Sequence, residues 1–210
     1  MPATVRVHGE AAIRVEPDDA LLVIALTAIE DRPGAALSDV STRTQALAAI
    51  LDRLGVAKAD RSTTGISVEE EFDHSSRGRR SVGHRAVNRM SVRMTDHELI
   101  GQVIVEATEQ LAAQVEGPHW AIARSNPARL QAAREAAADA RRRAQAYAEG
   151  VGARLGPPLK LSETQAHMGP RRGGGFIAVA AAAGPLPLEA GEQEVLASVQ
   201  VTFALEFDDQ

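Results

Sequence analysis

The chain has 210 residues, of which 44% are hydrophobic and 24% are charged. These proportions are ordinary for a globular protein, and they exclude a wholly disordered, collagenous or membrane-embedded chain. The absence of cysteine excludes disulfides, thiolate nucleophiles and cysteine-based metal sites. A net charge of -5 gives no general basic surface, so we expect no nucleic-acid partner.

The first 95 residues are predicted to form strands around one long helix. Apolar alternation over residues 5–15 and the β-branched run at 21–29 predict two strands joined by a short turn. A helix is predicted to begin at Pro33 and to end at Gly55, where a positive φ is needed. Two more strands, at 63–72 and 82–95, flank a polar loop at 74–81. The predicted helix has a buried stripe at spacings of three and four: Leu37, Val40, Thr44, Leu47, Leu51 and Leu54.

The second half repeats this alternation of helices and strands. Thr95 and Glu98 fit a capping box, which predicts a helix over residues 96–114. A strand at 119–123 leads to Asn126 and Pro127, a cap and a helix-starting proline. Strands at 159–166 and 194–207 follow this third helix. The predicted buried stripes are Leu99, Val103, Ala107 and Leu111 in the second helix, and Leu130, Ala133, Ala137, Ala140, Ala144, Tyr147 and Val151 in the third.

The order of elements suggests an internal repeat. A strand, a long helix, a strand, a loop and a strand occur over about residues 21–95 and again over about 119–207. The last strands of the two units are also similar, with Ala86 to Val92 beside Ala197 to Thr202. The predicted fold class is therefore α+β, with duplicated βαββ-like units that form a mainly antiparallel sheet and helices packed on one face.

Several short motifs, in this order, resemble the SIMPL domain family, also called DUF541. They are Val5-Arg6-Val7-His8-Gly9-Glu10 with Val15-Glu16-Pro17-Asp18, Gly83-His84-Arg85-Ala86-Val87-Asn88, Ala140-Arg141-Arg142-Arg143-Ala144, and Gly191-Glu192-Gln193-Glu194-Val195 with Val199-Gln200-Val201-Thr202-Phe203. The resemblance covers residues 5–207 and implies a single SIMPL-like domain over 1–210. His84 stands where the family usually has an aromatic residue.

The resemblance also implies a function class. Members of the family have an α+β fold and no established enzymatic activity, so no catalytic residue is carried over. Bacterial members are frequently exported to the periplasm or outer membrane, self-associate, and have proposed links to oxidative-stress tolerance. Animal members have a proposed link to a signalling-kinase partner. The sequence as written opens without an apolar leader, so we expect a cytoplasmic protein, or a periplasmic or exported one if a leader was removed.

A search for catalytic or metal-binding patterns finds none. The six histidines never have zinc-motif spacing, and no Gly-x-Ser-x-Gly elbow occurs. We therefore expect no enzyme, no cofactor and no metal. The alternative is a small-ligand or metal-binding domain that uses the basic loops and His84. In that hypothesis His74 and His84 flank the mouth of a hairpin, with Glu71 and Asp73 nearby.

The candidate interaction residues lie in the polar loop at 74–81, in the segment directly after it, and in a second loop near the C-terminus. The basic positions are Arg77, Arg79, Arg80, His84 and Arg85, with Arg171 and Arg172 in the second loop. A long Gly-, Pro- and Ala-rich loop over about 168–190 adds the apolar positions Phe176, Ile177 and Val179. Its apolar run is too short to cross a bilayer, so no transmembrane segment is expected. The favoured interpretation is a non-enzymatic, self-associating scaffold protein that forms a homo-oligomer and binds a protein partner.

Overall fold

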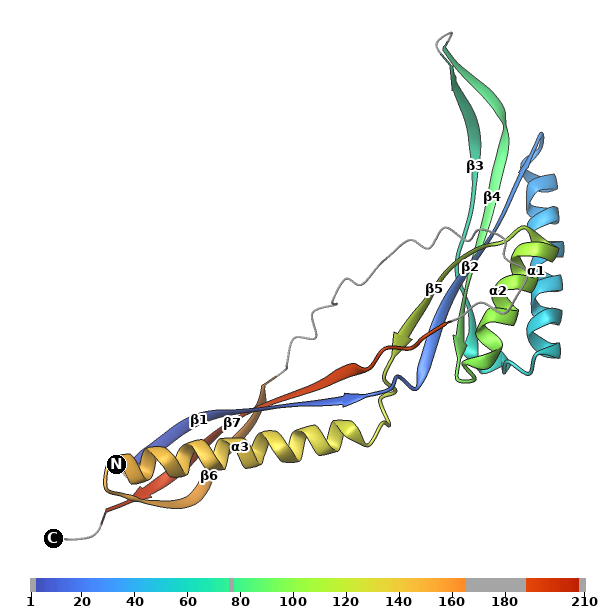
Figure 1. Ribbon diagram of the computed structural model, residues 1–210. Helices are drawn as coiled ribbons and strands as arrows, with labels where there is room; N and C mark the ends of the chain where they lie inside the picture. Colours follow the sequence, from blue (N-terminus) through green and yellow to red (C-terminus); the bar gives the residue numbers. More distant parts are fainter. Residues whose placement is uncertain (1–2, 76–77, 165–187, 208–210) are drawn as a thin grey trace. The chain divides into compact units, whose positions relative to one another are not determined.

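The structure, a computed structural model, describes residues 3–75, 78–164 and 188–207. The chain forms two compact units, each with its own sheet and helices (Figure 1). We call them the central unit, made of Asp18–Ala121 and Ala182–Ala190, and the terminal unit, made of Met1–Pro17, Ile122–Ala181 and Gly191–Gln210.

The central unit is a four-stranded antiparallel sheet in the order β3-β4-β2-β5, with two helices packed on one face. The pairing of β3 with β4 continues as far as Ser75 and Gly78, beyond the point at which β2 ends opposite His84. The two strands therefore project from the sheet as a two-stranded arm, visible in Figure 1. The elements are β2 (Asp19–Glu30), α1 (Pro33–Arg53), η1 (Lys58–Asp60), β3 (Arg61–Ser75), β4 (Gly78–Met94), α2 (Glu98–Leu111) and β5 (Gln114–Ala121).

The core of the central unit follows from alternation along β2. Ala20, Leu22, Ile24, Leu26 and Ala28 are all buried, because every second side chain of a strand points to the same face. That face packs against α1 and α2. Complete burial of a leucine or isoleucine side chain contributes about 1.5–3 kcal/mol, so this row anchors both helices.

Helix α1 begins and ends where the sequence predicts. Pro33 is its first residue, and Gly55 follows its end with φ +77°. The N–H of Val56 then donates to the carbonyl of Leu51 at 2.9 Å, which closes the helix end. The predicted stripe needs one correction, because Leu37 is 42% exposed while its neighbour Ala36 is buried.

The terminal unit is a three-stranded antiparallel sheet in the order β1-β7-β6, with one helix packed on it. Odd-numbered residues of β1 and β7 face this helix, and Val7, Val201 and Phe203 form the buried cluster with its alanines. The elements are β1 (Thr4–Val15), α3 (Ala128–Gly150), β6 (Arg154–Thr164) and β7 (Gln193–Glu206).

Helix α3 lies unusually close to its sheet. A Cβ atom on Gly9 would lie 2.1 Å from the carbonyl oxygen of Ala136 and 2.5 Å from the nitrogen of Ala140. Only glycine on β1 and small residues on the helix allow this approach. The buried stripe is accordingly made of alanines at a strict spacing of four: Ala128, Ala132, Ala136, Ala140, Ala144 and Ala148.

The predicted stripe of α3 is therefore correct at Ala140 and Ala144 and wrong at most of its other positions. Leu130, Tyr147 and Val151 are 60–67% exposed, although they are the largest side chains of the predicted stripe. The predicted cap of α2 is also wrong, because Asp96 rather than Thr95 accepts the N–H of Glu98, at 3.0 Å. The cap before α3 is confirmed, since the Asn126 side chain accepts the N–H of Ala128 at 2.9 Å.

The predicted fold class is confirmed. The central unit contains a strand, a helix and two strands in the order β2, α1, β3, β4. The terminal unit contains the same series as β1, α3, β6 and β7, and in both sheets the last strand of the series lies between the other two. The terminal unit takes its first strand from the N-terminus, because the segment near His119 belongs to β5 and pairs with β2. The polar loop predicted at 74–81 is shorter than expected, since β3 runs to Ser75 and β4 starts at Gly78.

Candidate functional site

The segment Gly83 to Asn88 lies at the base of the two-stranded arm, on β4. Here the sheet is three strands wide, and His84 stands between Glu30 of β2 and Glu70 of β3 in the cross-strand register. The next row places Arg85 between Ile29 and Glu69. Because successive residues of a strand point to opposite faces, the side chains of His84 and Arg85 leave the sheet on opposite sides. The two therefore do not form one basic site.

Gly83 allows the close contact between β4 and the end of β2. Its φ is +132°, a conformation that residues with side chains rarely adopt, and a Cβ atom there would lie 2.8 Å from the carbonyl oxygen of Glu30. The pairing of β3 with β4 shifts by one residue between Glu71 and Phe72. The backbone irregularity thus falls next to His84, where bulges commonly redirect side chains.

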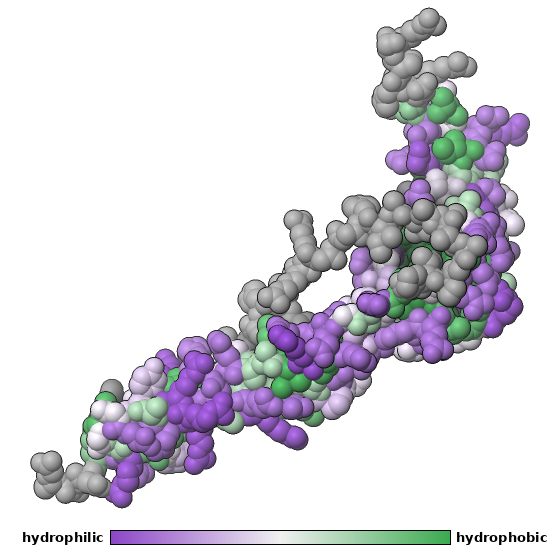
Figure 2. Space-filling view, viewed as in Figure 1, coloured by the Kyte–Doolittle hydropathy of each residue, from purple (hydrophilic) through white to green (hydrophobic). Residues whose placement is uncertain are grey.

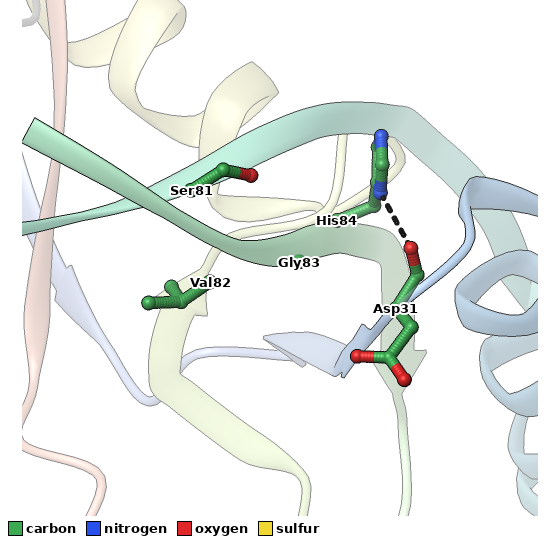
Figure 3. Close-up of a pocket in the computed structure, with 5 residues that line it drawn as sticks. All are labelled: Asp31, Ser81, Val82, Gly83 and His84. Atoms are coloured by element: carbon green, nitrogen blue, oxygen red, sulfur yellow. Dashed lines mark hydrogen bonds between the residues drawn. The ribbon is translucent and has the colours of Figure 1, made fainter.

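A pocket of about 480 Å³ opens beside this irregularity (Figure 3). It is lined by Asp31, Ser81, Val82, Gly83 and His84. The Nδ1 atom of His84 lies 3.3 Å from the carbonyl oxygen of Asp31, so Nδ1 is the donor and Nε2 keeps its lone pair in the neutral ring. The polar groups present can hydrogen-bond a small ligand, and the imidazole is the only nitrogenous base among the lining side chains.

Arg85 is held by an acidic partner on β3. Its Nε and Nη2 atoms donate to the two carboxylate oxygens of Glu71 at 2.6 and 2.7 Å, a bidentate ion pair. These hydrogen bonds, with the charges of Glu71 and Glu69, raise the pKa of Arg85 above its ordinary value. Arg85 therefore ties β4 to β3 at the base of the arm.

Asn88 connects the same strand to α1 through the core. It is 7% exposed, and its Nδ2 donates to the hydroxyl of Thr44 at 2.8 Å. That hydroxyl donates in turn to the carbonyl of Val40 at 2.7 Å. The Oδ1 atom of Asn88 is buried and has no partner among the residues that the structure describes. Gly83, Arg85, Ala86 and Asn88 of this segment thus each have a structural role, since Ala86 is also fully buried.

Most of the other candidate residues lie outside what the structure describes. Arg77, Arg171, Arg172, Phe176, Ile177 and Val179 are outside the described residues, as are the side chains of Arg79 and Arg80. The backbone register places His74 opposite Arg79, four positions along β3 from Glu70, which stands opposite His84. Four strand residues span about 13 Å, so the backbones of His74 and His84 are well separated. Within the described part of the chain, no three His, Asp or Glu residues are grouped to hold a metal ion.

Two edge strands carry exposed apolar side chains, a feature that the sequence analysis missed. Ile66 and Val68 on β3 are 64% and 37% exposed, and Leu159 and Leu161 on β6 are 54% and 61% exposed. Figure 2 shows green hydrophobic surface among purple hydrophilic surface along the β3–β4 arm. The sequence signal was present, because these residues alternate with polar ones, but alternation alone does not distinguish a covered strand from an edge strand.

The fold and this segment define a class of protein: an α+β protein built from duplicated βαββ sets, whose motif residues support the backbone. A family model described as "Protein of unknown function (DUF541)", SIMPL, matches residues 5–203, nearly the whole chain. The chain therefore belongs to the SIMPL family. No curated protein matches it. Among the described helices, none is both long enough and apolar enough to cross a membrane.

Proposed function

We propose that this protein is a non-enzymatic, self-associating scaffold or interaction protein. The observation that carries the proposal is an edge strand with exposed apolar side chains, Ile66 and Val68 on β3. Edge strands offer unpaired backbone N–H and C=O groups, which add strands from another chain. The motif residues Gly83, Arg85 and Asn88 support the same proposal, because each is used to hold the fold.

The direct test is the molar mass in solution. Light scattering on the full chain after size exclusion, over a concentration series and at two salt levels, should give a discrete multiple of 22.2 kDa over the upper part of the series. A mass of 22.2 kDa at every concentration would refute self-association. Membership of the SIMPL family adds a role in oxidative-stress tolerance to this proposal. The test of that role is the survival of a deletion strain under peroxide, with and without the wild-type gene.

A second candidate function is favoured by the pocket beside His84. A site of about 480 Å³ that contains an imidazole and the Asp31 carboxylate is large enough for a small ligand. Zn²⁺ or Ni²⁺ serves as a probe of the imidazole, since either ion binds the lone pair of a neutral ring. A melting temperature that rises with the ion in wild type and not in His84→Ala would support this candidate, and an unchanged melting temperature in wild type would remove it.

A further inference from the structure

The two sheets have four edge strands, and three of them carry devices that oppose strand addition. On β1, the backbone N–H of Glu10 donates to Oδ2 of Asp139 at 3.2 Å, so a side chain already occupies this edge. Asp139 is held there by Arg142 and Arg143, at 3.1 and 2.9 Å. A strand that paired with β1 would have to displace this carboxylate from its hydrogen bond.

Prolines interrupt the edges of β6 and β5. Pro157 and Pro158 lie near the start of β6, where the register against β7 is irregular. Pro118 lies in the middle of β5, where the pairing with β2 shifts. Proline has no N–H, and natural proteins use it on edge strands to stop pairing with other chains.

The register of β3 against β4 also shifts, between Thr63 and Gly65 and between Glu71 and Phe72, but no proline lies between these two shifts. Residues 61–75 contain no proline, and no described side chain is hydrogen-bonded to the backbone of residues 65–70. Ile66 and Val68 are exposed on the face of this strand that carries the helices, at positions that the helices do not cover. Among the edge strands that the structure describes, β3 is therefore the one left open over residues 65–70.

We propose that β3 pairs antiparallel with β3 of a second copy about a two-fold axis at Ser67. The proposal rests on the self-association proposed above and names its interface. A second copy is the occupant that fits, because this register is self-complementary. Ile66 of each copy lies opposite Val68 of the other, so four apolar side chains form one row on the helix-bearing face.

The charges on β3 select this register. With the axis at Ser67, Glu69 lies opposite Gly65, and Glu70 and Glu71 lie beside Thr63 and Thr64, where the register of β3 against β4 shifts, so no glutamate faces another. An axis at Glu69 or Glu70 would place acidic side chains directly opposite each other, which is destabilising. An axis at Val68 would place Glu70 opposite Ile66 and break the apolar row.

Cysteine cross-linking tests the register, and the chain has no native cysteine to interfere. Ser67→Cys places two thiols opposite each other across the axis, and both kinds of antiparallel pair have Cα separations within disulfide range. Ser62→Cys is the matched control on the same exposed strand, because its two copies would lie roughly 30 Å apart. With copper phenanthroline as oxidant, Ser67→Cys should become mostly a covalent dimer and Ser62→Cys should not.

A lysine pair tests whether the same edge drives assembly. Ile66→Lys with Val68→Lys puts like charges opposite each other twice, at positions exposed enough to leave the monomer folded. The matched control is Leu159→Lys with Leu161→Lys on β6, which has similarly exposed leucines on a proline-interrupted edge. We expect at least a tenfold weaker assembly for the β3 pair and an unchanged assembly for the β6 pair.

The outcomes separate this inference from the proposed function. Suppose that wild type is oligomeric but Ser67→Cys forms no cross-link, or that the lysine pair on β3 leaves assembly unchanged. Either result would overturn the β3 interface and leave self-association intact. Equal cross-linking of Ser62→Cys would overturn the register. A monomeric wild type would overturn both the β3 interface and self-association. This holds even if the β3 edge binds a strand of a different protein.

Discussion

Replacing Gly9 by alanine tests how tightly α3 packs on the terminal sheet. The added Cβ would lie 2.1 Å from the Ala136 carbonyl oxygen, more than 1 Å short of the roughly 3.4 Å at which ordinary contact begins. The nearest atoms belong to the helix backbone, which cannot rotate away as a side chain would. The helix must therefore move out by about 1 Å, which loosens the whole alanine stripe. Overpacking of this kind costs about 1–3 kcal/mol, and we expect the upper end for Gly9→Ala.

The assay is denaturant unfolding, with Gly150→Ala as the control in the same unit. A Cβ on Gly150 meets nothing within 4 Å, and alanine is favoured over glycine in a helix by up to about 1 kcal/mol, so the control should be neutral or slightly stabilising. The single tyrosine, Tyr147, is in the terminal unit, and the single tryptophan, Trp120, is in the central unit. Far-UV circular dichroism and tyrosine fluorescence should shift, while tryptophan fluorescence should not. A Gly9→Ala protein as stable as Gly150→Ala would refute the close approach of helix and sheet.

Three further substitutions probe the fold by unfolding titrations. Asn88→Ala loses the buried hydrogen bond to Thr44 and should lower the free energy of unfolding of the central unit by about 1–3 kcal/mol. Adding Thr44→Val to this variant should lower it little further, and additive losses would contradict the pairing. Gly83→Ala, at φ +132°, should cost about 1–3 kcal/mol, and an unchanged midpoint would show that the strain is absent. The hydrogen bond from Glu10 lowers the pKa of Asp139, so its contribution is complete above pH 4 and is lost as the pH falls through the lowered pKa. Asp139→Asn should therefore be less stable than wild type at pH 7, and this deficit should shrink as the pH falls below the ordinary aspartate pKa, whereas a deficit that does not change with pH would argue against this assignment.

The positions of helices and strands were easier to predict from the sequence than the side of each helix that is buried. The two ends of α1 were predicted correctly, because proline favours the first turn of a helix and glycine favours the positive φ after its end, as at Pro33 and Gly55. The buried face of α3 was predicted correctly only at Ala140 and Ala144, because the predicted stripe also ran through large apolar residues such as Leu130 and Tyr147, which are exposed. The alanines are buried because Gly9, far away in sequence, brings the backbones together, and a helix read alone contains no sign of that partner.

The candidate site was predictable only in part. The segment around His84 was identified from its resemblance to a family, but the neighbours of His84 on β2 and β3, Glu30 and Glu70, depend on the strand register. Asp31, which lines the pocket, follows β2 and meets His84 only through the pairing of β2 with β4. Exposure of Ile66 depends on where α1 and α2 end over the sheet, which no local pattern specifies.

Hydrogen exchange as a function of protein concentration tests the β3 interface most directly. Peptides that cover residues 65–70 should exchange more slowly as the concentration rises through the assembly range, because outward N–H groups become bonded to the second copy. Peptides that cover residues 157–162 of β6 should exchange at the same rate throughout. An oligomer whose β3 peptide shows no dependence on concentration would contradict the account.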